Sequence, residues 1–408
     1  MSQGPALPPT PLPLSERAAA IQPSATLAVL AEAARMREQD IDVVGFGAGE
    51  PDFDTPESVR GKAIEAIHEG FTRYTPTTGI LPLRNAISQK LRDDQGLDYG
   101  PDCVLATPGG KYACHLAFQV TCNPGDEVLV PAPFWTSYPE QICLAQARPV
   151  VLETREADGF KLSPDALAAA VGPRTKMLVL NSPSNPTGSV YSREELAALG
   201  EALKGSNVLV LSDEIYEKII FGDARHHSIA AVAPFLKDRT FLVGGVSKTY
   251  AMTGWRIGWL AGPREAIAAA ARLADHTTSN PCSIAQKAAL AALLGGDEPV
   301  RRMVAEFDKR RLYAFSRISQ MPGLACAPPE GAFYLFPNVG RCYGRRIGET
   351  ALSDSVSFAR ALLVHARVAV VPGIAFGADS HVRISYATSQ DEIEKGLDRL
   401  EEFLARLS

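Results

Sequence analysis

Short apolar runs of strand length recur through the first three quarters of the chain. They lie at 104–107, 127–130, 176–180, 208–211 and 240–243. Helical patterns separate them, as at 111–120 and 192–203. Strands that are continuously apolar are typical of a mostly parallel sheet covered by helices on both faces. Ligands of such sheets bind in the loops at the carboxyl ends of the strands, so chemistry is expected there.

The last quarter of the chain has a different pattern. One long charged helix is expected at about 297–321, connecting to a second domain with strands at 333–336, 368–371 and 382–385. A final helix begins near Ser389, where Ser389 and Glu392 are predicted to form a capping box. The sequence therefore predicts an α/β protein, with a large domain built on a mostly parallel sheet sandwiched by helices and a smaller α+β domain. The expected boundaries are a flexible Pro-rich tail at 1–14, an N-terminal segment joining the small domain at 15–55, the large domain at 56–295 and the small domain at 296–408.

Composition narrows the classes of partner. A net charge of −5 gives no reason to expect nucleic acid or membrane as a partner. No apolar run approaches the roughly 20 residues of a transmembrane helix, and the start of the chain lacks the layout of a signal peptide. The seven cysteines include no Cys-x-x-Cys pair, which disfavours metal and disulfide roles and favours a reducing cytoplasm. Four of them lie in apolar surroundings and are expected to be core thiols: Cys103, Cys114, Cys122 and Cys143.

The most informative segment follows the apolar run at 240–243. Lys248 leaves this predicted strand among small residues, so its ammonium is expected to be partly desolvated, with a lowered pKa. Such an amine is a candidate for forming a Schiff base. Eight residues later, Arg256 is flanked by glycines, and its planar fork suits a phosphate. A reactive amine beside a phosphate clamp is what pyridoxal 5′-phosphate requires, although an isolated Ser-Lys pair is more often a surface feature.

Loops after other predicted strands could complete such a site. Gly109, Gly110 and Lys111 open a helix whose N-terminus would favour phosphate, although Gly-Gly before a helix is more often only a tight turn. Asp213 ends a buried strand, where a carboxylate is costly unless it is paired, and a protonated pyridine nitrogen would pair it. The alternative for Asp213 is a cap on the next helix. Tyr216, three residues further on, could donate to the ring oxygen O3′.

Two further candidates come from irregular segments. Asn185 lies in the Pro- and Gly-rich loop 181–188 and could also donate to a ring oxygen, with a rigid turn as the alternative. Trp135 follows a strand and could lie against the cofactor ring, although a tryptophan in this position is more often a core residue.

Taken together, these segments resemble the fold-type I, class I aminotransferases from about residue 15 to the C-terminus. The resemblance implies a pyridoxal 5′-phosphate enzyme with Lys248 at the imine position, Asn185 and Tyr216 at O3′, and Ser247 near the phosphate. It also implies that Gly49 offers the substrate a backbone contact, that Arg383 holds the substrate α-carboxylate, and that Trp135 and Asn185 contact the substrate as well. Tyr74 is expected to reach the partner's cofactor phosphate in a homodimer with shared sites. No metal is implied.

Within that class, the sequence resembles the bacterial subgroup of aspartate and prephenate aminotransferases. In that subgroup a lysine at the position of Lys111 lies near the substrate's distal carboxylate. Phosphate neutralisation is the alternative role for Lys111. Gly245 stands where some relatives have a phosphate-binding serine, and Gln22 lies in a region that helps to distinguish prephenate from aspartate. We therefore expect a ping-pong aminotransferase acting on aspartate and 2-oxoglutarate. The alternatives are a prephenate or aromatic aminotransferase, a carbon–sulfur lyase, and an effector-sensing regulator.

Overall fold

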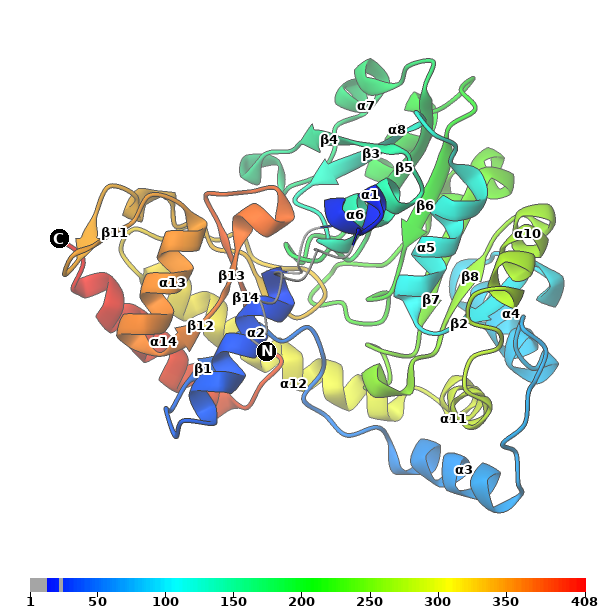
Figure 1. Cartoon of the computed structure of the whole chain (residues 1–408), viewed down its shortest axis with the longest axis horizontal. Coiled ribbons are helices and arrows are strands. Elements are labelled where there is room, and N and C mark those ends of the chain that lie inside the picture. Colours follow the sequence, from blue (N-terminus) through cyan, green and yellow to red (C-terminus); the bar gives the residue numbers. More distant parts are fainter. Residues whose placement is uncertain (1–12, 22–24) are drawn as a thin grey trace, which may run out of the picture.

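The structure, a computed structural model, describes residues 13–21 and 25–408. Most of the predicted tail, and Gln22, lie outside the described residues. Figure 1 shows two masses side by side, one around a large central sheet and one around the last quarter of the chain. The long helix α12 (Glu298–Gln320) starts beside the large mass and runs into the second one. The division into domains at 55 and 295 remains a prediction.

The large sheet has seven strands in the order β2-β8-β7-β6-β5-β3-β4. All neighbouring strands are parallel except at β8, which is antiparallel to both β2 and β7. The strands are β2 (Val104–Thr107), β3 (Glu127–Ala132), β4 (Arg148–Glu153), β5 (Thr175–Asn181), β6 (Leu209–Asp213), β7 (Thr240–Gly245) and β8 (Gly258–Ala261). The apolar pattern missed β4, since an edge strand is only partly buried. It also missed β8, which follows directly on the segment around Arg256.

Helices cover both faces of this sheet, as the buried strand pattern predicts. One apolar cluster joins alternate strand residues to α5 (Gly110–Thr121), α6 (Ser137–Leu144) and α10 (Arg264–Asp275). On the opposite face, one cluster contains α7 (Pro164–Ala170), α8 (Arg193–Ala202) and α9 (Ile229–Val232). Another contains α3 (Glu57–His68), α4 (Leu81–Gln95) and α11 (Ser283–Leu294). Alternating residues of the same strands supply both faces, so the sheet is the shared core.

The second mass is built around a small antiparallel sheet, in the order β13-β14-β9. Its strands are β9 (Tyr334–Leu335), β13 (Val371–Pro372) and β14 (Val382–Ser385). The predicted strand 368–371 is in fact two strands, because β12 (Val368–Ala369) pairs in parallel with β1 (Val44–Gly45) instead. The helices packed here are α2 (Ala25–Arg37), α13 (Ser355–Ala366) and α14 (Gln390–Ala405). Shorter elements are α1 (Glu16–Ala20), β10 (Arg346–Ile347) and β11 (Thr350–Ala351).

Two local predictions need correction. Ser389 caps α14 by accepting from the Glu392 N–H, but the Glu392 carboxylate binds Lys395, so the reciprocal half of the capping box is missing. Cys143 is exposed near the end of α6 and is not a core thiol, whereas Cys114 is buried and Cys103 and Cys122 are half-buried. Of the helices in the described ranges, none has both the length and the apolar character to cross a bilayer.

Candidate active site

A cavity of about 260 Å³ lies where the carboxyl ends of the large sheet's strands face the small sheet. Most of the residues singled out in the sequence line it, although they come from segments spread over more than 330 positions. Those that line it are Gly49, Gly110, Lys111, Trp135, Asn185, Asp213, Tyr216, Ser247, Lys248, Arg256 and Arg383. Gly109, which precedes Gly110 in the chain, and Tyr74 are not part of the lining.

Lys248 lies in the turn that follows β7. Its Nζ donates a hydrogen bond to the Gly49 carbonyl and lies 5.9 Å from the centre of the Tyr216 ring. Burial lowers the pKa of Lys248 to about 8, with smaller contributions from Glu50, which raises it, and Arg383, which lowers it. A substantial fraction of this amine is therefore neutral near physiological pH, which a nucleophile or a proton acceptor requires.

Asp213, at the last position of β6, is a buried carboxylate held by neutral donors. The Tyr138 hydroxyl donates to its Oδ2 at 2.7 Å, and the Cys114 thiol lies 3.8 Å from the same oxygen. Its Oδ1 accepts one backbone N–H, from Ile215, at 3.2 Å. Burial raises the pKa of Asp213 to about 6. Among the described residues no cationic side chain forms an ion pair with Asp213, so the pocket contains an acidic group suited to a cationic ligand atom.

The turn between β2 and α5 forms a narrow cradle with Arg256. Gly109 caps α5 without a side-chain hydrogen bond and has φ 85°, and a Cβ at this position would overlap the Arg256 guanidinium. The Arg256 Nη1 donates to the Thr253 carbonyl at 2.8 Å, which fixes the guanidinium over the first turn of α5. A helix N-terminus and a guanidinium aimed at one point form an anion site of the kind that binds phosphate.

Position 245 is a glycine, and not the serine of some relatives, because two strands run close together there. It is paired with Gly258 across β7 and β8, and a Cβ at this position would lie 2.9 Å from the Ile215 Cδ1 and 3.2 Å from the Gly258 Cα. The strand pair is too close for a side chain at position 245, so the nearest side-chain hydroxyl that follows β7 and lines the cavity is that of Ser247.

Arg383 lies on the central strand of the small sheet and is almost completely buried, with 2 % of its surface exposed. The alternative of a surface arginine on an edge strand is therefore wrong. Its Nη1 donates to Asn185 Oδ1 and its Nη2 to the Gly47 carbonyl, both at 2.9 Å. The buried Nε has no hydrogen-bond partner in the described structure. Arg383 also lines the cavity, and a guanidinium in a cavity wall is suited to a carboxylate ligand.

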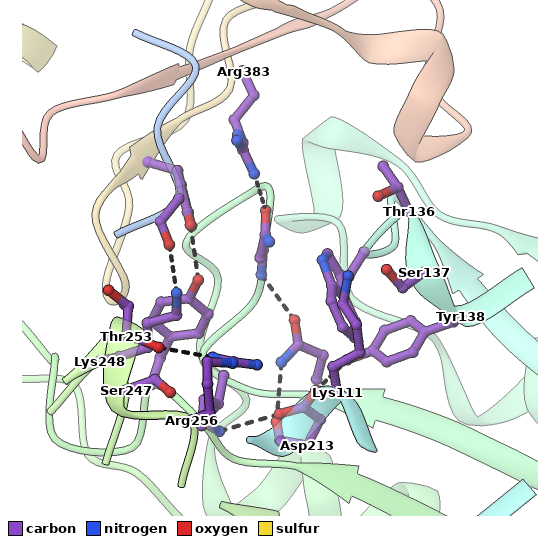
Figure 2. A pocket seen from close by; sticks show the side chains of 18 residues that line it. Lys111, Thr136, Ser137, Tyr138, Asp213, Ser247, Lys248, Thr253, Arg256 and Arg383 are labelled. Atoms are coloured by element: carbon purple, nitrogen blue, oxygen red, sulfur yellow. Dashed lines mark hydrogen bonds between the residues drawn. The ribbon is translucent and has the colours of Figure 1, made fainter. Parts of the chain in front are cut away.

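The loop carrying Asn185 is fixed at both ends. Asn185 N–H donates to Asn181 Oδ1 at 2.8 Å, and Asn181 Nδ2 donates to the Asp213 carbonyl at 3.0 Å, which ties the loop to the neighbouring strand (Figure 2). Gly188 has φ 71°, and its carbonyl accepts the N–H groups of Glu330 and Gly331 at 2.9 and 2.8 Å.

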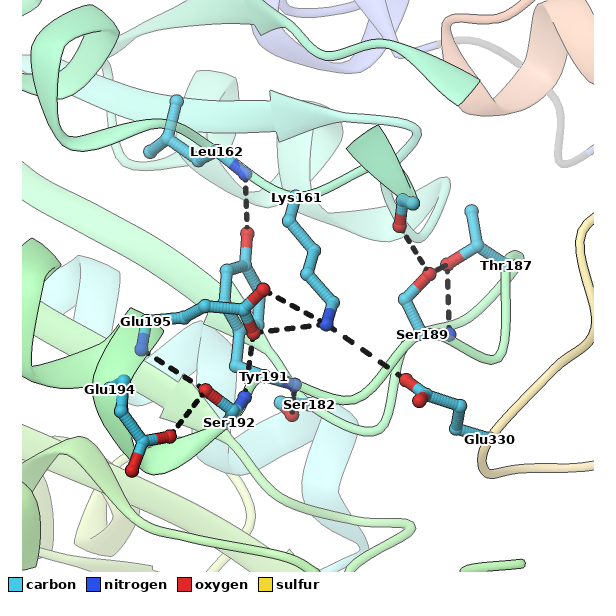
Figure 3. A network of polar contacts seen from close by, with 11 residues as sticks. Lys161, Leu162, Ser182, Thr187, Ser189, Tyr191, Ser192, Glu194, Glu195 and Glu330 are labelled. Atoms are coloured by element: carbon cyan, nitrogen blue, oxygen red, sulfur yellow. Dashed lines mark hydrogen bonds and ion pairs between the residues drawn. The ribbon is translucent and has the colours of Figure 1, made fainter. Parts of the chain in front are cut away.

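Beyond Gly188 the same loop enters α8 through a complete capping box of Ser192 and Glu195. Figure 3 shows that Lys161 bridges this cap to the segment that contacts Gly188, with its Nζ 2.9 Å from Glu195 and 3.9 Å from Glu330. The loop is thus held by the large sheet on one side and by the segment before β9 on the other.

Lys111 and Trp135 form one wall of the cavity. The Lys111 Nζ lies 5.1 Å from the centre of the Trp135 ring. Burial, and then the charge of Arg256, lowers the pKa of Lys111. Two cations on one side of the cavity favour a ligand with more than one anionic group, which leaves both proposed roles of Lys111 open.

Tyr74 is 92 % exposed and lies away from this cavity, beside a shallow pocket formed with residues 278–284. Its contact with a partner's cofactor stays a prediction. Three residues that the sequence reasoning missed do belong to the site: Tyr138, Asn181 and Tyr334. Tyr138 follows Trp135 by three positions, at the start of α6, and could have been found as a polar residue next to Trp135, whereas nothing local marked Tyr334.

The chain matches the family model for aminotransferase class I and II over residues 41–400. It therefore belongs to this family.

Among its relatives, it is 48 % identical to an aspartate aminotransferase of Geobacillus stearothermophilus, over 96 % of this chain and 98 % of that protein. It is 45 % identical to an aspartate/prephenate aminotransferase of Cereibacter sphaeroides, over 97 % and 99 %. Its structure superimposes on the aspartate aminotransferase of Rhizobium meliloti with a TM-score of 0.94 at 40 % identity, over 98 % of this chain and 100 % of that chain. These matches establish the α/β fold of the aminotransferases for this chain.

Proposed function

We propose that this protein is a pyridoxal 5′-phosphate-dependent aminotransferase that moves the amino group of aspartate to 2-oxoglutarate in two half-reactions. The observation that carries the proposal is the cavity itself: a partly neutral lysine, a buried carboxylate without a cationic partner among the described residues, and a buried arginine line one space. The relatives named as aspartate aminotransferases support the choice of amino donor.

The residues present fit the cofactor. The cradle that a Cβ at Gly109 would fill suits a phosphate, with Arg256, Ser247 and the first N–H groups of α5 as donors. Asp213 would hold a protonated ring nitrogen, and Tyr216 and Asn185 would donate to the ring hydroxyl oxygen. When bound, pyridoxal 5′-phosphate supplies an aldehyde that reacts with amines and a ring that takes up the electron pair released at the substrate's α-carbon.

The protein's own groups then have separate tasks. The Lys248 Nζ, whose pKa of about 8 leaves part of it neutral, accepts the proton from the α-carbon of the amino donor and gives it up again within the same half-reaction. In the second half-reaction, which runs in the reverse direction, it delivers a proton to the α-carbon of the amino acid that is formed. Arg383, which lines the cavity, holds the α-carboxylate and so fixes the direction in which the Cα–H bond points. Trp135 covers one side of the cavity and excludes water from it.

Lys111 supports a dicarboxylate substrate. It lines the same cavity as Arg383, and its ammonium is half-buried without a carboxylate partner among the described ion pairs. A substrate with carboxylates at both ends would satisfy both cations, whereas a neutral side chain would leave Lys111 unpaired.

A homodimer with shared sites completes the proposal. Tyr74 is a large aromatic side chain that is almost fully exposed, which suits a residue that is covered by a second copy of the chain. Mixing a Lys248→Ala protein with a Tyr74→Ala protein tests it: subunit exchange should restore about a quarter of wild-type activity per site, whereas monomers in light scattering, or no recovery after exchange, would refute sharing.

The test of the reaction is a panel of amino donors assayed with purified protein. Aspartate with 2-oxoglutarate should give the highest kcat/KM, and Lys248→Ala should abolish turnover and the visible absorption band. A higher kcat/KM for glutamate with prephenate would instead place the protein with the aspartate/prephenate relatives. Pyruvate release from cystathionine without an added 2-oxo acid would indicate a lyase and contradict the proposal.

A further inference from the structure

Tyr334 on β9 links three separate parts of the active site and has no role in the mechanism described so far. Its side chain is completely buried but forms part of the cavity wall. Its hydroxyl lies 2.8 Å from the Tyr216 hydroxyl, and its ring lies 4.4 Å below the Arg383 guanidinium. A Cβ placed on Gly49 would contact the Tyr334 hydroxyl at 3.4 Å.

The small sheet sets this position. Tyr334 is opposite Ser385 in the β9–β14 ladder, and Arg383 is two residues from Ser385 on the same face. Diagonal neighbours of this kind are within reach of an aromatic ring and a long side chain. The contact between the guanidinium and the Tyr334 ring favours one orientation of Arg383. A second aromatic ring, that of Phe376, has its centre 5.2 Å from the same guanidinium.

The contact with Tyr216 crosses between the two masses of the protein, because Tyr216 follows β6 of the large sheet. The two rings meet edge to face, with centres 5.9 Å apart. Burial raises the pKa of both tyrosines, so each hydroxyl keeps its single proton at neutral pH. One of the two must donate to the other.

The proposed function decides which. If the Tyr216 hydroxyl donates its hydrogen bond to the cofactor's ring oxygen, it can only accept in the 2.8 Å contact, and the Tyr334 hydroxyl must be the donor there. A hydroxyl that accepts a hydrogen bond becomes a stronger donor, because the bonds polarise one another. The donor to the cofactor would therefore be a pair of tyrosines and not Tyr216 alone.

Resting on the proposed function, we propose that Tyr334 is a positioning residue of the aminotransferase reaction. Its hydroxyl donates to Tyr216 and strengthens the hydrogen bond that Tyr216 makes to the cofactor, and its ring holds Arg383 in line with the substrate carboxylate. One residue of the small sheet thereby couples cofactor electronics to substrate binding.

The test separates the hydroxyl from the ring in the holoenzyme. Tyr334→Phe keeps the ring under Arg383, so the pH midpoint of the cofactor's visible band should rise by roughly half a pH unit while the KM for the amino donor changes less than about 2-fold. Tyr334→Leu removes both parts, and should shift the midpoint similarly and raise KM by about 10-fold. Tyr386→Phe is the matched control, because its fully buried hydroxyl donates to the Ala332 carbonyl and lies in the same core.

A double substitution tests whether Tyr334 acts through Tyr216. Tyr216→Phe alone should raise the midpoint more than Tyr334→Phe does, and adding Tyr334→Phe to it should give no further shift. The inference would be overturned, and the proposed function would stand, if Tyr334→Phe left the midpoint unchanged. The same conclusion would follow if Tyr334→Phe shifted the midpoint by as much in the Tyr216→Phe protein as in the wild-type protein. A protein that forms no visible band with pyridoxal 5′-phosphate would overturn the proposed function, and this inference with it.

Discussion

The cofactor-free protein should contain one lysine that reacts far more readily than the others. Burial lowers the pKa of Lys248 to about 8 from an ordinary value of 10.5. At pH 7 the neutral fraction is then ~9 % instead of ~0.03 %, so the concentration of reactive amine is ~300-fold higher than for an unperturbed lysine.

The assay is competitive labelling of cofactor-free protein with trace amounts of an amine reagent across pH 6–11, read by peptide mass spectrometry. The labelling rate of Lys248 should have its midpoint near pH 8. Lys62 is a reference within the same sample, because it is exposed and its hydrogen bond to Glu65 raises its pKa. Each peptide then reports its own titration.

Removing the charge of Glu50 tests the direction in which this carboxylate shifts the pKa of Lys248. Glu50 raises the pKa of Lys248, so Glu50→Gln should move the labelling midpoint further down, while Glu402→Gln on the exposed side of α14 should leave it in place. Desolvation is the largest cause, so neither substitution should restore an ordinary titration. A Lys248 midpoint near pH 10 in the wild-type protein would refute the account given for its reactivity.

Three further predictions concern single residues. Lys111→Ala should lower kcat/KM for aspartate by roughly 10- to 100-fold and for alanine by less than about 3-fold, and equal losses would favour its role at the phosphate. Asp213→Asn should abolish turnover, but in the cofactor-free protein it should raise the unfolding temperature at pH 8. The reason is that a folded-state pKa of about 6, above the ordinary 3.8, makes ionisation cost about 3 kcal/mol above pH 6, a cost that disappears as pH falls through 6 towards 3.8. A larger stabilisation at pH 5 than at pH 8 would contradict that sign. Gly109→Ala should weaken binding of pyridoxal 5′-phosphate at least about 10-fold in an equilibrium titration, because the new methyl group overlaps Arg256, whereas Gly205→Ala, in an open turn with similar φ, should leave it unchanged.

Local sequence determined the sheet and the loops that carry the chemistry. Buried strands are apolar over their whole length, so the strands ending at Asp213 and Gly245 could be located from periodicity, and parallel order then brought their following loops to one edge. Lys248 and Asp213 could be identified as candidates because each is charged where an apolar strand stops, and Arg256 because glycines flank it eight residues after Lys248. Edge strand β4 and antiparallel β8 were missed, since partial burial weakens the apolar signal of one and the other adjoins a glycine-rich segment.

Only the tertiary structure decided how these candidates act on one another. The pKa values of Lys248 and Asp213 depend on how much water the surrounding fold removes, and the sequence does not contain that quantity in any local form. The same holds for Tyr138 at Asp213 and for Tyr334 at Tyr216, whose hydroxyl contacts join residues 75 and 118 positions apart in the chain. Periodicity specifies which face of an element is buried, but packing between elements specifies what that face touches. The sequence by itself therefore determined the groups present at the site, and the fold determined their ionisation and their partners.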